Sequence, residues 1–298
     1  MLEIKTREQL ENMEGSNQVL GRAPEMIRSK ILFDGEDNIL YCGENVQLVD
    51  SVLEFRGNHS IIFLEDNKFP YYLNLVIQKD CAFYMGKDNY INGSMHIILA
   101  ENQNCVIGAL NNFSLQVWMR TADAHLIYEA ETKKRINPSG SIFIGDHVWV
   151  GQSCFLLKGT QIDSGSVIGA MSVVANKKIG CNTAWAGNPC REIRKGIFWD
   201  GDCTNRWGKK RSDLSMDYET YLGEYKSEQP ADKWMYCYQP QECIEYETID
   251  QELKKRSTAK KKYEYLMQLT ANRDKNRFVH KREEVRKKSL FAGWKKES

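Results

Sequence analysis

The sequence predicts an all-β fold, a parallel β-helix, followed by a mainly helical C-terminal extension. Three observations predict it. An aliphatic residue recurs every six positions between Ile144 and Val174, a small or slim residue recurs at the fifth place of each six, and residues from about 248 to 288 are highly charged with apolar residues at helical spacing. A period of six fits neither an α-helix nor an alternating strand, whereas stacked hexapeptide coils produce it.

The six-residue repeat also predicts which residues stack. Its aliphatic places are Ile144, Val150, Leu156, Ile162, Ile168 and Val174, and its slim places are Val148, Cys154, Thr160, Ser166 and Ser172. Three units close one coil, so Ile144 is expected under Ile162, Val150 under Ile168, and Leu156 under Val174. Each buried aliphatic then contributes roughly 1.5–3 kcal/mol. The alternative, short antiparallel strands with glycine turns, does not hold a fixed six-residue register.

The rhythm divides the chain into segments. Residues 1–30 are a polar lead-in in which 8–13 and 23–31 could form short helices, and 31–196 are the β-helix domain, with imperfect units before residue 120. The rhythm stops over 120–141, which predicts a segment looped out of the coils. Residues 197–298 are expected to form a capping segment and a basic helical tail, because an uncapped last coil would expose apolar side chains and strand edges.

Charge is distributed unevenly along the chain. The whole sequence has a formal net charge of +1. Residues 251–298 hold 16 Lys and Arg against 6 Asp and Glu, a net charge of +10. The residues before them therefore hold 25 Lys and Arg against 34 Asp and Glu, a net charge of −9. This basic tail on an acidic body suggests peripheral contact with an anionic polymer or with the inner face of a membrane, and a solvated helix is the plain alternative. No nucleic-acid partner is expected.

Cysteine usage and the start of the chain predict a cytoplasmic protein. The nine cysteines are odd in number and contain no CxxC pair, which favours reduced thiols over a disulfide framework. The first fifteen residues lack the apolar core of a secretory signal, and no run of 18 apolar residues occurs.

Four motifs carry a resemblance to a known family. They are Asp123-Ala124-His125, Arg135-Ile136-Asn137-Pro138, Ile144-Gly145-Asp146-His147-Val148-Trp149 and Ala186-Gly187-Asn188-Pro189-Cys190-Arg191. Together they resemble the hexapeptide-repeat acyltransferases with a left-handed β-helix, particularly the sugar and capsular-polysaccharide O-acetyltransferases. The resemblance covers roughly residues 31–200, and the last hundred residues resemble no family.

The resemblance implies transfer of an acetyl group from acetyl-CoA to a sugar hydroxyl. His125 matches the family's catalytic position, and histidine suits a general base because its free pKa lies near working pH. The hydroxyl is itself the nucleophile, so direct attack without an acyl-enzyme is expected. Asp123 could orient the imidazole or accept a substrate hydroxyl, and it could equally be a plain loop carboxylate. His147 is expected to be a corner or groove-lining residue.

The resemblance also implies where acetyl-CoA binds. It places the pantetheine arm beside Trp149, Gln152 and Ala170, and the phosphate end beside Lys177, Lys178, Arg191 and Arg194. The chain departs from the family pattern between 174 and 182, so the choice between the two lysines stays open. A homotrimer with a groove between neighbouring chains is implied as well.

Other functions remain open on the same fold. The acceptor could be an amino sugar or serine rather than a polysaccharide hydroxyl, and a non-enzymatic binding scaffold is the alternative of another class. A γ-type carbonic anhydrase needs three histidines around zinc. The regular coils offer no third histidine beyond His125 and His147, so no metal is expected.

Overall fold

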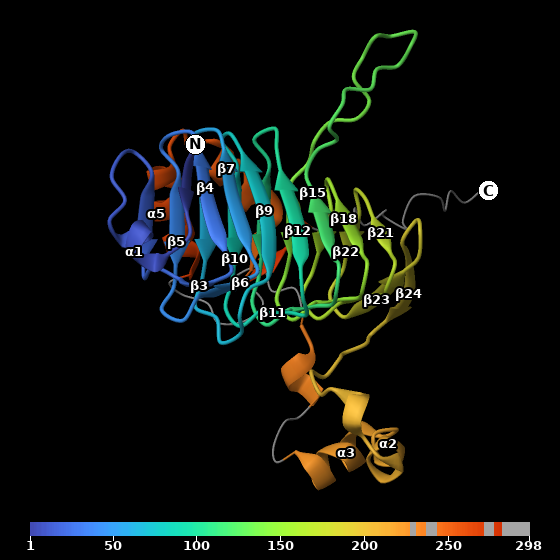
Figure 1. The fold of residues 1–298 in the computed structure, drawn as a ribbon. Helices are drawn as coiled ribbons and strands as arrows, with labels where there is room; N and C mark the ends of the chain where they lie inside the picture. Colours follow the sequence, from blue (N-terminus) through green and yellow to red (C-terminus); the bar gives the residue numbers. More distant parts are fainter. Residues whose placement is uncertain (227–230, 237–242, 271–276, 282–298) are drawn as a thin grey trace, which may run out of the picture.

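The computed structural model describes residues 1–226, 231–236, 243–270 and 277–281. Its coils stack into a prism with three faces (Figure 1), and each face is a β-sheet. Sheet 1 contains β1 (Leu2–Ile4), β4 (Lys30–Asp34), β7 (Val52–Arg56), β9 (Leu73–Gln78), β12 (Met95–Leu99), β15 (Trp118–Arg120), β18 (Phe155–Leu157) and β21 (Val173–Val174).

Two further sheets complete the prism. Sheet 2 contains β2 (Gln18–Gly21), β5 (Ile39–Cys42), β8 (Ile61–Leu64), β10 (Ala82–Met85), β13 (Asn104–Ile107), β16 (Ile142–Ile144), β19 (Gln161–Ile162) and β22 (Lys178–Ile179). Sheet 3 contains β11 (Tyr90–Ile91), β14 (Asn112–Phe113), β17 (Trp149–Val150), β20 (Val167–Ile168), β23 (Thr183–Ala186) and β24 (Arg191–Lys195), and the pair β3 (Glu25–Ile27) and β6 (Gln47–Val49) takes the corresponding place in the first coils. Each coil runs from sheet 2 to sheet 3 to sheet 1, and the corners between them are called the 2/3, 3/1 and 1/2 edges below.

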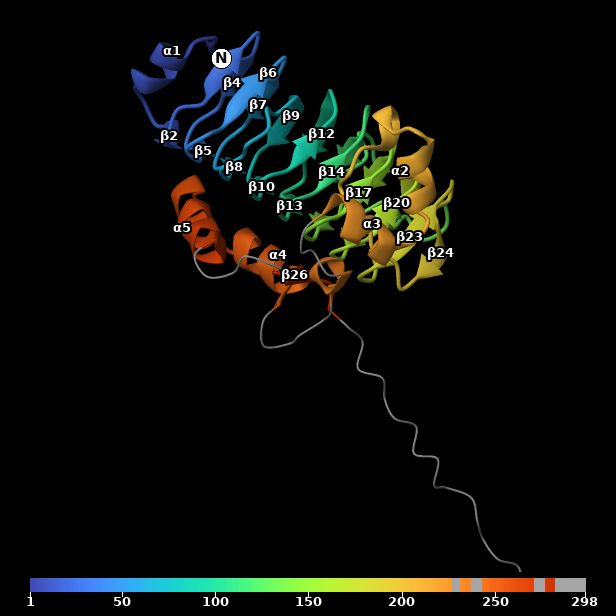
Figure 2. The ribbon, with the colours of Figure 1, turned by 90° about the horizontal axis from the view of Figure 1, so that it is seen from below.

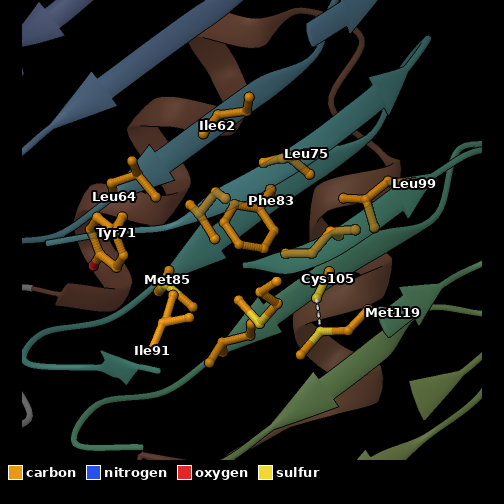
Figure 3. Packing of buried hydrophobic residues seen from close by; sticks show 14 of the residues in the cluster. Ile62, Leu64, Tyr71, Leu75, Phe83, Met85, Ile91, Leu99, Cys105 and Met119 are labelled. Atoms are coloured by element: carbon orange, nitrogen blue, oxygen red, sulfur yellow. Dashed lines mark hydrogen bonds between the residues drawn. The ribbon is translucent and has the colours of Figure 1, made fainter. Parts of the chain in front are cut away.

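The predicted stacking is confirmed in the last coils. Ile144 pairs with Ile162, Val150 with Ile168, and Leu156 with Val174, all in parallel register and all buried. Apolar side chains from the three sheets fill the prism along its length, as Figure 3 shows for Ile62, Phe83 and their neighbours. The β-helix fold class with a helical C-terminal extension is therefore confirmed.

The first coils are longer than the hexapeptide rhythm predicts. Leu53, Leu75, Ile97 and Met119 pair in succession at intervals of 22 residues (75 − 53, 97 − 75 and 119 − 97), whereas Ile144 and Ile162 are 18 apart. The expected imperfect units are thus regular coils with additional corner residues. Their corners use left-handed backbone, for example at Asp37, Asp80 and Asn102, as the Asn and Asp content predicts.

The N-terminal segment differs from the helices expected there. A helix, α1 (Arg7–Glu11), occurs near 8–13, but the second one expected over 23–31 is wrong, because this stretch forms β3 and the start of β4. Parallel pairing begins already with β2 at Gln18. The reason is packing: Ile31 and Phe33 of β4 point into the prism core, and that burial outweighs the weak helical pattern.

The C-terminal extension covers the outer face of sheet 2 (Figure 2). It comprises β25 (Ile244–Glu245), α4 (Tyr246–Lys254), α5 (Ala259–Thr270) and β26 (Phe278–Val279). Its apolar residues join outward side chains of sheet 2 in a second buried cluster that includes Phe63, Tyr84, Tyr246, Leu266 and Phe278. Residues 246–254 and 259–270 are therefore helical as predicted, 278–279 form a strand instead, and the helix predicted over 282–288 lies outside the described residues. The described part of the tail is docked on the β-helix rather than solvated.

Charged groups of this extension are buried against the coils. Lys262 is 1% exposed, and its Nζ donates to the carbonyls of His59 and Asp80 at 2.7 and 2.6 Å. Arg277 donates to Tyr84 Oη at 3.0 Å and lies 3.6 Å from Asp146 Oδ1. These contacts attach the extension to corners of the prism through specific polar partners.

The segment after the last coil hangs from the 2/3 edge (Figure 1). It contains η1 (Thr204–Arg206), α2 (Lys209–Leu214), α3 (Tyr218–Tyr225) and η2 (Ala231–Trp234). The buried ring of His147 stacks on Trp199 with centroids 3.9 Å apart and on Trp234 at 4.4 Å, and Trp199 Nε1 donates to the His147 carbonyl at 2.9 Å. His147 is a corner residue, as expected, and it holds this segment. Before it, β24 pairs antiparallel with β23 and covers that strand's edge.

Leu156→Ala is expected to lower the free energy of unfolding by about 2–5 kcal/mol, because Leu156 is fully buried between Met119 and Val174 in neighbouring coils. Its neighbour Phe155 points outward and is 41% exposed, so Phe155→Ala is the matched control and should cost much less. Urea unfolding followed by circular dichroism measures both. Equal losses of unfolding free energy for the two variants would contradict the inward orientation of Leu156.

Lys262→Met is expected to change how stability depends on pH. Burial lowers the pKa of Lys262 to about 8 from 10.5. Above about pH 8 the unfolded chain therefore holds this proton more tightly than the folded chain, so the wild-type protein gains stability relative to the variant as pH rises toward 10, by at most about 1.4 kcal/mol per pH unit. Urea unfolding of both proteins at several pH values measures the difference. A difference that stays flat would show that Lys262 is not buried as described.

Candidate active site

The looped-out segment is an arm that leaves the prism at the 1/2 edge. Residues 121–141, called the arm, connect β15 in sheet 1 to β16 in sheet 2 and project away from the coils (Figure 1). Its two limbs pair through Ile136 N, which donates to the Ile127 carbonyl at 2.9 Å, and Glu129 N, which donates to the Lys134 carbonyl at 2.9 Å. Large apolar side chains are more than half exposed on it: Leu126, Ile127, Tyr128 and Ile136.

The predicted base lies where the arm leaves the coils. His125 is exposed, and its ring makes no hydrogen bond or ion pair within the described part of the chain. Both ring nitrogens are thus open to a substrate. An accessible imidazole of this kind is suited to act as a general base.

Asp123 fastens the arm to the coils. Its carboxylate forms an ion pair with Lys158, which follows β18 at the same edge, and accepts a hydrogen bond from Asn137 Nδ2 at 2.9 Å. The Lys158 ammonium, and then the Asn137 amide, lower the pKa of Asp123, so the carboxylate stays ionised at neutral pH. The hydrogen bonds of Asp123 therefore lead to Lys158 and Asn137, and an orienting role toward the imidazole stays a prediction. Lys158 is a site residue that the motifs did not indicate, because it lies 35 residues further along the chain.

Three of the seven predicted acetyl-CoA residues share one surface. Trp149, Val167, Ala184 and Arg194 pair in succession across sheet 3, so Trp149 and Arg194 belong to one row, and both are exposed. Arg191 lies on the same strand as Arg194 and is also exposed. A planar ring and two cations on one face are suited to an elongated anionic ligand.

The 3/1 edge beside this row carries the other two groove residues. Gln152 and Ala170 are both exposed there, and the Gln152 carbonyl accepts from Met171 N at 2.8 Å. A Cβ on Gly151 would lie 2.5 Å from Ala170 N, so only glycine lets the two coils approach this closely. The edge thus presents closely packed backbone, bordered by the exposed Gln152 and the small side chain of Ala170.

The two lysines lie elsewhere. Lys177 is at the 1/2 edge, where its carbonyl accepts from Gln161 N at 2.8 Å. Lys178 is on β22 in sheet 2, and its Nζ lies 3.1 Å from Glu247 Oε1 in α4. The structure therefore does not bring Lys178 together with the Trp149 row, and it commits this ammonium group to the C-terminal extension.

Within one chain the predicted base and the predicted groove lie at different edges. His125 belongs to the 1/2 edge, whereas Gln152 and Ala170 belong to the 3/1 edge, and sheet 1 lies between the two. The outer face of sheet 1 carries a stacked row of His96, Trp118 and Phe155, with centroids 4.2 and 6.2 Å apart. The predicted site therefore falls into two halves that lie apart within a single chain.

The described residues contain no cluster of three or more His, Cys, Asp or Glu side chains that could hold a metal ion. None of the helices among them is both long and apolar enough to cross a membrane.

Comparison with known proteins shows which proteins this chain resembles. No family model matches the chain. In sequence it is 30% identical over 125 residues to the polysialic acid O-acetyltransferase of Neisseria meningitidis (42% of this chain, 58% of the relative) and 29% identical over 126 residues to that of Escherichia coli O1:K1 / APEC (42% and 40%). It is 33% identical over 122 residues to the putative acetyltransferase YJL218W of Saccharomyces cerevisiae (41% and 60%). The chain thus spans about half the length of these curated relatives.

Two solved structures share the fold over more of the chain. The polySia-specific acetyltransferase NeuO superposes with a TM-score of 0.58 at 26% identity, covering 71% of this chain and 94% of that one. The polysialic acid O-acetyltransferase OatWY gives a TM-score of 0.51 at 24% identity, covering 68% and 99%, and supports the fold alone. The comparisons confirm the resemblance to hexapeptide-repeat acyltransferases, in particular to capsular-polysaccharide O-acetyltransferases.

Proposed function

We propose that this protein is an acetyl-CoA-dependent O-acetyltransferase that acts on a sugar hydroxyl of a polysaccharide. The single observation that carries the proposal is the exposed, unpaired ring of His125 at the base of the arm, on a fold shared with the polysialic acid acetyltransferase NeuO. The sequence similarity to two polysialic acid O-acetyltransferases supports a polymeric acceptor.

His125 acts as a general base in this proposal. Its ring nitrogen takes the proton of the acceptor hydroxyl while the hydroxyl oxygen forms a bond to the thioester carbonyl carbon. The carbon–sulfur bond then breaks, and the imidazolium returns the proton to the departing thiolate. A positioned base typically contributes about 10²–10⁴-fold to the rate, and a backbone N–H directed at the carbonyl oxygen would stabilise its developing charge.

The donor lies along the 3/1 edge and sheet 3. The pantetheine arm would lie along the exposed backbone between Ala170 and Gln152, where the small alanine leaves room beside it. Arg194, in one row with Trp149, and Arg191 on the same strand are placed to pair with the phosphates. Lys177 remains a candidate, and Lys178 is the weaker one because it pairs with Glu247.

We also propose that the site is completed in a homotrimer. The 1/2 edge of one chain, with its arm, would lie against the 3/1 edge of the next, so that His125 meets the neighbour's groove. A contact between two different surfaces of identical chains is heterologous, and it forms a closed ring where the rotation between neighbours allows closure. Three copies is the number that the family resemblance implies. The exposed apolar side chains of the arm, Leu126, Ile127, Tyr128 and Ile136, would then be covered.

The acceptor and the setting belong to the same proposal. The alternatives are an amino sugar or serine as the acceptor, and a non-enzymatic binding scaffold that transfers no acetyl group. Assays with a panel of acceptors separate these alternatives. A cytoplasmic location remains part of the proposal. Contact of the basic tail with a membrane or an anionic polymer rests partly on 282–298, outside the described residues, while Lys262 and Arg277 of the described part are buried in the chain itself.

His125→Ala is expected to lower the acetyltransfer rate by about 10²–10⁴-fold, because it removes the base. Release of free thiol from acetyl-CoA, measured with sialic acid polymers, neutral polysaccharides, amino sugars and serine, reads the rate and the acceptor class together. His59→Asn, which changes a half-buried ring at a corner of an earlier coil, is a control that keeps every residue of the proposed site. Wild-type rates for His125→Ala, or no thiol release with any acceptor, would contradict the proposal.

Mixing two inactive variants is expected to restore activity. His125→Ala removes the base and Ala170→Trp blocks the proposed donor edge, so each homotrimer should be inactive. After co-expression and random assembly, about a quarter of the interfaces join a chain that keeps His125 to a neighbour that keeps Ala170. The mixture should therefore show about a quarter of wild-type activity. Mass photometry should give three times the 34.5 kDa chain mass. A trimer of mixed variants without activity would place both halves of the site within one chain.

A further inference from the structure

Asn137 is unusual among the residues of the arm. It is 6% exposed, whereas every other residue from 123 to 140 is exposed or half-buried. A buried amide must find hydrogen-bond partners, since each unsatisfied group costs about 1–3 kcal/mol. Asn137 lies in the Arg-Ile-Asn-Pro motif, yet nothing in the motif itself says what its side chain does.

The Asn137 side chain binds three groups of the opposite limb of the arm. Its Oδ1 accepts from Ile127 N at 2.8 Å, and its Nδ2 donates to the His125 carbonyl at 2.8 Å and to Asp123 Oδ2 at 2.9 Å. The backbone pairing of the limbs ends at Ile127 and Ile136 on the side of the coils. The side-chain amide of Asn137 therefore continues the pairing of the two limbs from Ile127 to His125, where it takes the place of a backbone group.

Two links tie this amide to the coils. Asp123 pairs with Lys158, as described above. Arg135, whose Nε donates to Asn137 Oδ1 at 3.3 Å, binds Glu101 through two hydrogen bonds of 3.1 and 2.9 Å. Asn137 thus joins both anchors of the arm to the residue that carries the imidazole.

The chemistry of the position requires asparagine. A primary amide supplies two donors and one acceptor on a short, planar group, and Pro138 restricts the backbone of Asn137 to extended conformations. Aspartate has the same shape but no N–H donor. Its carboxylate would place a negative charge against Asp123 and an acceptor against the carbonyl of His125. Alanine would leave all three without this partner.

We propose that Asn137 is the positioning residue of the site: by holding the carbonyl of His125 and the carboxylate of Asp123, it fixes where the arm presents the imidazole. This inference rests on the proposed function. Displacement of a catalytic group by about 1 Å can cost on the order of 10²-fold in rate. Asn137 itself touches neither substrate nor reacting atoms.

The test compares Asn137→Asp with Asn38→Asp in the full-length protein. Asn38 is fully buried in the first coils, and its amide has the same pattern: Nδ2 donates to Gly57 O at 2.8 Å and to Asn17 Oδ1 at 3.1 Å, while Oδ1 accepts from Ser60 N at 3.0 Å. Asn137→Asp is expected to lower kcat on the order of 10²-fold with KM for acetyl-CoA and Tm unchanged. Asn38→Asp is expected to lower Tm by several degrees with kcat unchanged.

His125→Ala in the same assay separates this inference from the proposed function. Full activity of His125→Ala overturns both. An inactive His125→Ala together with wild-type kcat for Asn137→Asp overturns the positioning role alone. If Asn137→Asp lowers Tm as Asn38→Asp does, or raises KM for acetyl-CoA while leaving kcat intact, Asn137 is a structural or binding residue and the inference fails.

Discussion

Stacking of inward aliphatic side chains from coil to coil is the interaction on which the rest of this structure depends. Parallel pairing places each inward residue over its equivalent, as in the row Met119, Leu156 and Val174, and a coil cannot bury these side chains alone. The row tolerates insertions only at the corners. Met119 lies beside Leu156 although 37 residues separate them, because the arm is inserted at an edge and leaves the register unchanged.

The same constraint decides where chemistry can occur. Faces and interior are fixed by pairing and packing, so polar residues with free functional groups collect at the edges, on a rigid scaffold. His125 and Ala170 occupy two edges of one chain. This separation is the reason for proposing a homotrimer, in which the neighbouring copy would supply the other half of the site.

Repetition determined what could be predicted from the sequence. The pairs such as Ile144 with Ile162 followed from the 18-residue interval and are confirmed. The 22-residue coils did not show as a repeat, because extra corner residues break the hexapeptide phase while the stacking continues. Asp123 with Lys158, and Lys178 with Glu247, could not be foreseen, since each contact depends on the path of an inserted or appended segment. Asn137 was visible as part of a motif, but its role lies in the folded arm.

The appended segment also changes the meaning of the charge count. Glu65, Asp146 and Asp163 are buried along sheet 2 and the 2/3 edge, and a buried carboxylate without a partner is costly. The C-terminal extension supplies the partners: Arg277 lies 3.6 Å from both Glu65 and Asp146, and the backbone N–H of His280 donates to Asp163 Oδ1 at 2.9 Å. Part of the positive charge of residues 251–298 thus neutralises the acidic body from within. The described extension is therefore a component of the β-helix fold, and the net charge of +10 overstates what it can offer to a partner.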